Sequence, residues 1–234
     1  MELNFSKCVS MTVTRKKNVT LFPYKLGHHL IHRVVEYKYL GVTLTSELKW
    51  DSHINLVVSK ALSKLSYLRR AMKHSTPSTK LTAYLTLVRP AIEYANVVWY
   101  PSEQKYIDKL ERIQRLALRF IFNSYRRFSS ITLLYQKSGL TTLQNRASVL
   151  RLKMMFRMIH GLLNIDTSKY FSLCKSRVSR NKHSFHLKEA PFHCNTFRDS
   201  FFLQTVREWN NLPESVVCCE NVNSFADRVE AFIR

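Results

Sequence analysis

Residues 102–121 read SEQKYIDKLERIQRLALRFI, and this stretch decides the fold class. Its apolar residues recur every three or four positions, at Ile107, Leu110, Ile113, Ala117, Phe120 and Ile121. Residues at this spacing share one face of an α-helix. The pattern therefore predicts an amphipathic helix, capped by Ser102, that buries its apolar face in a larger helical fold.

The opposite face of this predicted helix is basic. It carries Lys105, Lys109, Arg112, Arg115 and Arg119. Side chains at this spacing are able to follow a phosphate backbone. The alternative is an ordinary solvated face, which normally mixes charges of both signs. Only Asp108 and Glu111 dilute the positive charge, and we therefore predict nucleic-acid contact by this face.

Helical patterns continue on both sides of this stretch. Apolar positions in residues 54–72 predict one helix, and Thr76–Pro77 places an N-cap before an N1 proline at the start of the next, with a kink expected at Pro90. Further along, Thr141 and Gln144 form a capping-box pattern that opens a helix ending near residue 160. The centre of the chain is thus predicted to be a helical bundle.

The two ends of the chain lack long helical patterns. Residues 1–48 contain short β-forming runs, with Gly41 inside one of them, and predict a small β region. From Asp166 the periodicity is lost until a short final helix expected after Ser224. The expected fold is mainly α: a helical bundle with a small N-terminal β remnant and an irregular basic C-terminal region.

Charge indicates the partner. The chain holds 37 Lys and Arg against 16 Asp and Glu, a net charge of +21. Sixteen of these bases and a single acid lie in residues 112–188. Nucleic acid is the usual polyanion for such an excess, and an anionic membrane surface is the alternative. We predict RNA or DNA as the partner and no membrane, with further contacts from Arg126, Arg127, Arg177, Arg180 and Lys182.

Cysteine and histidine predict neither a disulfide framework nor a metal site. The five cysteines are odd in number and irregularly spaced, and no apolar signal segment begins the chain, so an intracellular location in the nucleus or cytoplasm is expected. The candidate zinc ligands are Cys174, His183, His186, His193 and Cys194, but they lack the paired spacings of zinc sites. We predict no cofactor in this chain.

Three motifs carry a resemblance to a known family. They are NFSKC at residues 4–8, YLGV at 39–42 followed by LKW at 48–50, and REWNNLP at 207–213. Their order and spacing resemble the C-terminal part of jockey-like reverse transcriptases of non-long-terminal-repeat retrotransposons. The likeness covers essentially the whole chain.

The resemblance implies three parts and a function. Residues 1–48 would be the end of the palm with a primer-grip-like hairpin, 49–165 a thumb-like helical domain, and 166–234 a basic C-terminal region. The implied function is template and primer binding within an RNA-directed DNA polymerase. Lys7 would then steady nucleotide phosphates, although a solvated strand lysine is the favoured explanation without the rest of the palm. Gly41 would approach the primer, and from the residues alone a β-bulge glycine explains this position equally well.

The polymerase chemistry of that family is not expected from this chain alone. Two-metal phosphoryl transfer needs carboxylates close together. No two of the five aspartates are adjacent in the sequence: Asp51, Asp108, Asp166, Asp199 and Asp227. We therefore expect no catalytic residue here, with Mg²⁺ belonging to a palm that would precede Met1 in a longer reading frame. The alternative is a stand-alone basic RNA- or DNA-binding interaction module without enzymatic activity.

Overall fold

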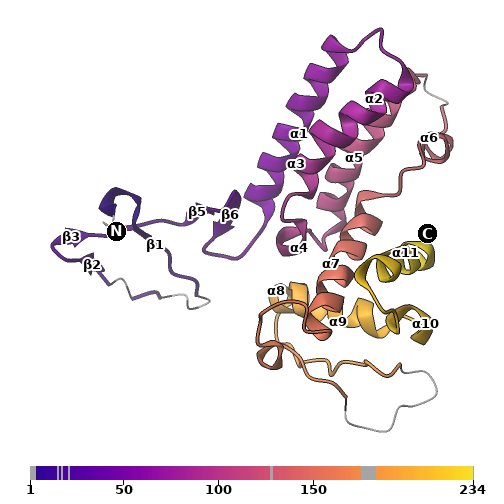
Figure 1. The fold of residues 1–234 in the computed structure, drawn as a ribbon. Helices are drawn as coiled ribbons and strands as arrows, with labels where there is room; N and C mark the ends of the chain where they lie inside the picture. The colour runs from indigo at the N-terminus through magenta and orange to yellow at the C-terminus, as the bar shows by residue number, and fades with distance from the viewer. Residues whose placement is uncertain are drawn as a thin grey trace. The chain divides into compact units, whose positions relative to one another are not determined.

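The computed structural model describes residues 4–14, 16, 18–20, 22–126, 129–174 and 183–233. The chain forms two compact units, Met1–Ser59 and Lys60–Arg234, each of which is described here by itself. Figure 1 shows helices through most of the chain and short strands near the N-terminus. The mainly helical fold with a small N-terminal β remnant is confirmed, while the three predicted domains stay a prediction.

The first unit pairs short strands two by two within its described residues. After the turn η1 (Phe5–Lys7), the pairs form as follows: β1 (Val9–Ser10) is parallel to β4 (His32–Arg33), β2 (Lys25–Leu26) is antiparallel to β3 (His29–Leu30), and β5 (Glu36–Tyr39) is antiparallel to β6 (Val42–Thr45). Thr43 donates its backbone N–H to Nδ1 of the buried His53 at 3.1 Å. This bond fixes the β5–β6 hairpin on the first turn of the following helix.

Gly41 occupies a hairpin turn. Tyr39 pairs with Val42, so Leu40 and Gly41 are the two linking residues, and their φ angles are 45° and 83°. Positive φ at both positions is typical of the type I′ turn that matches the twist of two paired strands. The β-bulge explanation of Gly41 is therefore wrong, because the run divides into two strands at this glycine.

A long helix, α1 (Asp51–Ala71), leads into the second unit and is followed by shorter elements: α2 (Pro77–Ala83), the π-helical turn η2 (Tyr84–Val88), α3 (Arg89–Glu93) and α4 (Asn96–Trp99). Thr76 caps α2 as predicted, since its side chain accepts the N–H of Thr79 at 3.3 Å. Pro90 has no N–H to donate, and the π turn immediately before it accommodates that loss.

Three helices form the rest of the bundle: α5 (Gln104–Ile121), α6 (Ile131–Ser138) and α7 (Leu143–Ile159). Two predicted caps are wrong by one residue. Glu103 precedes α5 in place of Ser102, and Thr142, in place of Thr141, accepts the N–H of Asn145 at 3.1 Å. The backbone is extended at both Glu103 and Thr142, and helix ends commonly lie a residue or two from where local cap signals place them.

The C-terminal region is more helical than the sequence suggested. It contains η3 (Thr167–Lys169), α8 (Asn195–Arg198), α9 (Phe201–Asn210), α10 (Glu214–Val217) and α11 (Val222–Ile233). The last helix begins before Ser224 because Asn221 accepts the N–H groups of Asn223 and Ser224, at 3.1 and 2.9 Å. None of the described helices combines the length and apolar composition that crossing a bilayer requires.

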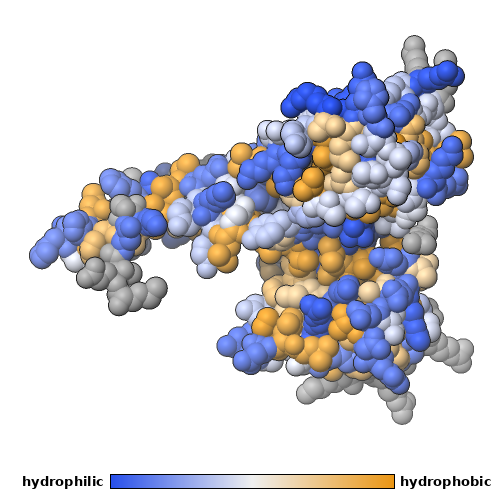
Figure 2. Space-filling model, turned by 45° about the horizontal axis from the view of Figure 1, so that its top comes forward, coloured by the Kyte–Doolittle hydropathy of each residue, from blue (hydrophilic) through white to orange (hydrophobic). Residues whose placement is uncertain are grey.

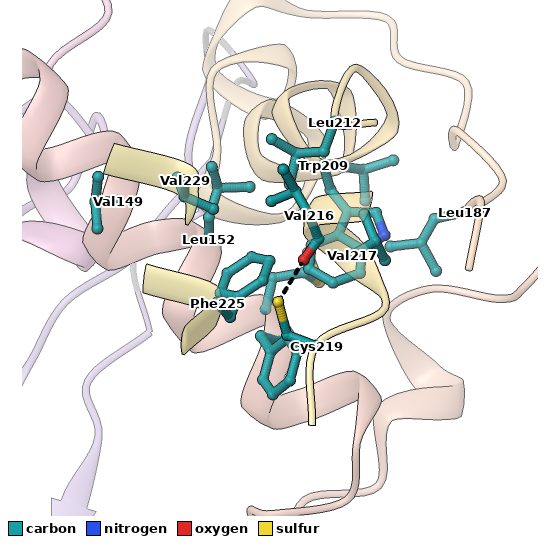
Figure 3. Packing of buried hydrophobic residues seen from close by; sticks show 13 residues of the cluster. Val149, Leu152, Leu187, Trp209, Leu212, Val216, Val217, Cys219, Phe225 and Val229 are labelled. Carbon is teal, nitrogen blue, oxygen red and sulfur yellow. Dashed lines mark hydrogen bonds between the residues drawn. The ribbon is translucent and has the colours of Figure 1, made fainter. Parts of the chain in front are cut away.

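A hydrophobic core joins α7 to these C-terminal helices. Trp209 and Phe225 are fully buried, with ring centroids 5.6 Å apart, and Phe156 stacks on Phe225 at 4.6 Å. Figure 3 shows side chains of α9 and α11 meeting around these rings. The indole N–H of Trp209 donates to the carbonyl of Phe185 at 2.9 Å, so the polar edge of the ring is satisfied as well.

Candidate nucleic-acid interface

Helix α5 buries its apolar face as predicted. Ile107, Leu110, Ile113, Ala117 and Ile121 are all buried. The basic face, formed by Lys105, Lys109, Arg112, Arg115 and Arg119, lies at the surface: the first three are exposed and the last two half-buried. The structure thus brings all five predicted residues of this helix to one side.

The two lysines of the basic face lie around a tyrosine. The Nζ atoms of Lys105 and Lys109 are 4.6 and 5.4 Å from the ring centroid of Tyr106. Lys105 also forms an ion pair with Glu103 at 2.6 Å, and this hydrogen bond raises the pKa of Lys105. Because both partners are exposed, this contact is easily exchanged for another anion.

The arginines of the basic face differ in what they contact. Arg115 donates to the carbonyl of Asp108 at 3.4 Å, and Arg119 donates to the carbonyls of Ser124 and Arg126 at 3.3 and 3.5 Å. Arg119 therefore satisfies backbone carbonyls after the end of α5, a role that basic residues often have at helix C-termini. Arg112 is exposed and pairs with no carboxylate among the described residues.

Glu111 does not dilute the basic face. Its side chain is buried between helices, where Oε1 accepts the backbone N–H of Gln144 at 3.0 Å and Oε2 accepts the hydroxyl of Tyr135 at 3.1 Å. Burial raises the pKa of Glu111, and the hydrogen bonds from Gln144 and Tyr135 partly oppose that rise. Within α5, Asp108 is thus the one acid left at the surface.

The other predicted contacts are scattered or lie outside the described residues. Lys7 and Gly41 are exposed in the first unit, and Arg126 is exposed just after α5. The residues Arg127, Arg177, Arg180 and Lys182 lie outside the part of the chain that the structure describes. Their roles stay predictions.

A second basic feature was missed by the sequence analysis. An open pocket of about 660 Å³ is lined by Arg69 and Arg70 of the last turn of α1 and by Lys73 and His74 just after it. Its other side is formed by Tyr125 and its neighbours at the end of α5 and beyond. One signal was available, since residues 52–92 contain seven Lys and Arg and no acid. The sequence does not predict that a second segment completes the pocket, because this depends on how the two helices pack.

The predicted lack of a metal site stays a prediction. In the described ranges no three His, Cys, Asp or Glu side chains gather as metal ligands would. His183, one of the candidate zinc ligands, is buried with Nε2 3.1 Å from the carbonyl oxygen of Trp209. Its position is explained by the core of the C-terminal helices.

Comparison with known proteins bears on the predicted resemblance. The chain is 27% identical over 128 residues to the RNA-directed DNA polymerase from mobile element jockey of Drosophila funebris. The aligned region covers 52% of this chain and 13% of that protein. It is 23% identical over 124 residues to the corresponding Drosophila melanogaster protein, with the same two shares. The resemblance to a jockey-like reverse transcriptase is confirmed over 52% of the chain, and not over the whole chain as predicted. No family model and no solved structure matches this chain, which corresponds to a small part of the curated relatives' length.

Proposed function

We propose that this jockey-like chain binds template and primer nucleic acid, RNA or DNA, as part of an RNA-directed DNA polymerase. The observation that carries the proposal is the basic face of α5, with Lys105, Lys109 and Arg112 exposed and Glu111 turned into the interior. A helix face of this kind follows successive phosphates without reading sequence. On this proposal residues 49–165 act as the thumb-like domain.

The similarity to jockey polymerases supports the same class of partner. Both relatives are named as RNA-directed DNA polymerases, whose templates and products are polyanions. A net charge of +21 attracts such a partner over long range, and direct contacts then decide where it is held. The proposal therefore predicts that affinity depends little on the nucleotide sequence and falls steeply as the salt concentration rises.

The test compares two doubly substituted variants with equal loss of charge. One replaces Lys109 and Arg112 of the basic face by Gln, and the other replaces the exposed Lys137 and Arg157. Binding to a labelled RNA–DNA hybrid is measured by fluorescence anisotropy at several salt concentrations. Each lost phosphate contact should reduce the slope of log affinity against log salt by roughly 0.7–0.9. The variant of Lys109 and Arg112 should lose more affinity than the variant of Lys137 and Arg157. Equal losses would contradict the proposal that α5 contacts nucleic acid.

We also propose that this chain does not supply the metal ligands of nucleotide transfer. Asp108, Asp166 and Asp199 lie on separate elements, where they accept hydrogen bonds from Gln104, Ser168 and Arg198 respectively. Two-metal chemistry needs carboxylates that share their cations. The purified chain should give no primer extension with Mg²⁺ or Mn²⁺, and extension that a single Asp→Asn change abolishes would contradict this proposal.

A further inference from the structure

The basic pocket lies where the end of α1 meets the segment after α5, and these two chain segments lie together at one end of the second unit (Figure 1). We define it by Arg69, Arg70 and Lys73 of one segment and Asn123 and Tyr125 of the other. Hydrophilic side chains gather over this end of the unit (Figure 2). At about 660 Å³ the pocket lies within the roughly 300–1,000 Å³ that small-ligand sites occupy.

The charge of the basic pocket is not compensated by acids. Arg69, Arg70 and Lys73 are exposed and form no ion pair with any described carboxylate. Lys80 lies behind Asn123, one of the residues that line the pocket. It is fully buried and donates a hydrogen bond from Nζ to Oδ1 of Asn123 at 2.9 Å. A buried ammonium without a carboxylate partner is costly unless something else offsets the charge. The whole cluster therefore favours an anion.

The basic pocket also offers an aromatic surface. The ring of Tyr125 is 54% exposed, and the guanidinium carbon of Arg69 lies 5.7 Å from its centroid. Phe120 lines the same pocket, and its ring centroid is 5.0 Å from Nζ of Lys80. Proteins that hold single strands combine a positive groove with rings on which bases stack, and arginine adds a cation–π contribution.

We propose that the basic pocket receives one unpaired nucleotide of a single-stranded segment, its phosphate on Arg70 and Lys73 and its base on Tyr125. The inference rests on the proposed function and adds to it a preference for single strands. A duplex keeps the faces of its bases inside its own stack, whereas an unpaired base presents a face to a protein ring. The pocket therefore distinguishes single strands from duplex, a distinction that the phosphate-directed basic face of α5 does not make.

The experiment uses the full chain and two oligonucleotides, a labelled single strand of about 12 nucleotides and a blunt duplex of equal length. Tyr125→Leu removes the stacking ring without changing charge. Tyr67→Leu is the control, because Tyr67 is 61% exposed on α1 and does not line the pocket. Tyr125→Leu should weaken single-strand binding about fivefold or more and leave duplex binding nearly unchanged. The control should alter neither affinity.

Two results would overturn the inference: unchanged single-strand affinity in Tyr125→Leu, or equal losses for single strand and duplex. If the wild-type chain binds neither oligonucleotide, the proposed function itself fails, and this outcome is distinct from a failure of the pocket alone. Circular dichroism checks that the variants fold. Should Tyr125→Leu unfold, Tyr125→Trp provides the second test: its larger ring should tighten single-strand binding, and unchanged or weaker binding rejects the pocket.

Discussion

Glu111 of α5 accepts the backbone N–H of Gln144 at 3.0 Å and so caps the first turn of α7 from another helix. A carboxylate at this place satisfies an N–H group that the helix itself leaves free and interacts favourably with the helix dipole. The same side chain accepts a hydrogen bond from the hydroxyl of Tyr135, a residue of α6, at 3.1 Å. One acidic residue thus fixes the positions of three helices.

Glu111→Ala should destabilise the chain. It removes the acceptor of the part-buried Gln144 N–H and of the Tyr135 hydroxyl, while Thr142 still caps α7, at a cost of about 1–3 kcal/mol in the free energy of unfolding. The matched control is Asp108→Ala in the same helix, where the side chain is exposed and the expected change is within about 0.5 kcal/mol. Urea unfolding followed by circular dichroism measures both. Equal effects would show that the Glu111 contact contributes nothing specific.

Glu111 also predicts a pH dependence. Burial raises its pKa in the folded chain above the value in the unfolded chain. Its protonated form therefore adds stability that is fully present below the unfolded pKa and is lost as pH rises through the folded pKa. Since Gln does not titrate, the stability of the wild type relative to Glu111→Gln should fall as pH rises across this window. Unfolding curves measured from pH 4 upward test this, and a constant difference would contradict the assigned cause.

The ion pair between Arg151 and Glu208 holds α7 to α9. Arg151 Nη2 lies 2.5 Å from Glu208 Oε1, and the arginine side chain is only 4% exposed. Glu208→Ala leaves a buried charge without its partner and should cost about 3–5 kcal/mol. Replacing both residues with apolar ones, as in Arg151→Met with Glu208→Leu, should cost clearly less. A double variant as unstable as the single one would mean that packing, and not charge, causes the loss.

Phe225 should be among the most sensitive positions of the C-terminal core. It is fully buried between Phe156 and Trp209. Phe225→Ala opens a cavity and should lower the free energy of unfolding by about 3–5 kcal/mol. Phe232→Ala in the same helix is the control, because Phe232 is 53% exposed and should change stability by less than about 0.5 kcal/mol. Thermal unfolding of both variants measures the contrast.

Lys80→Met separates stability from binding. Methionine fills the space of the buried lysine stem and removes a charge that lacks a carboxylate partner, so the free energy of unfolding should stay equal or rise by about 1 kcal/mol. Single-strand binding should nevertheless weaken, because the charge behind the basic pocket is lost. Stability from urea unfolding and affinity from anisotropy are measured on the same preparation. A stability loss above about 2 kcal/mol would show that the charge supports the fold.

The sequence by itself determined the long helices of the bundle, α1, α5 and α7, and the basic face of α5. Both depend on residues three or four positions apart, and helix geometry brings these together whatever surrounds them. The fold class and the resemblance to jockey-like polymerases were therefore accessible from residues such as Ile107 and Leu110 and from short motifs in order.

Only the tertiary structure decided where Glu111 points, which residue caps α7, and that Arg69 and Tyr125 share a pocket. These relationships join residues tens of positions apart, and nothing in local spacing records them. They follow from how apolar faces pack against each other, because packing fixes which polar groups are buried and must find partners from another helix.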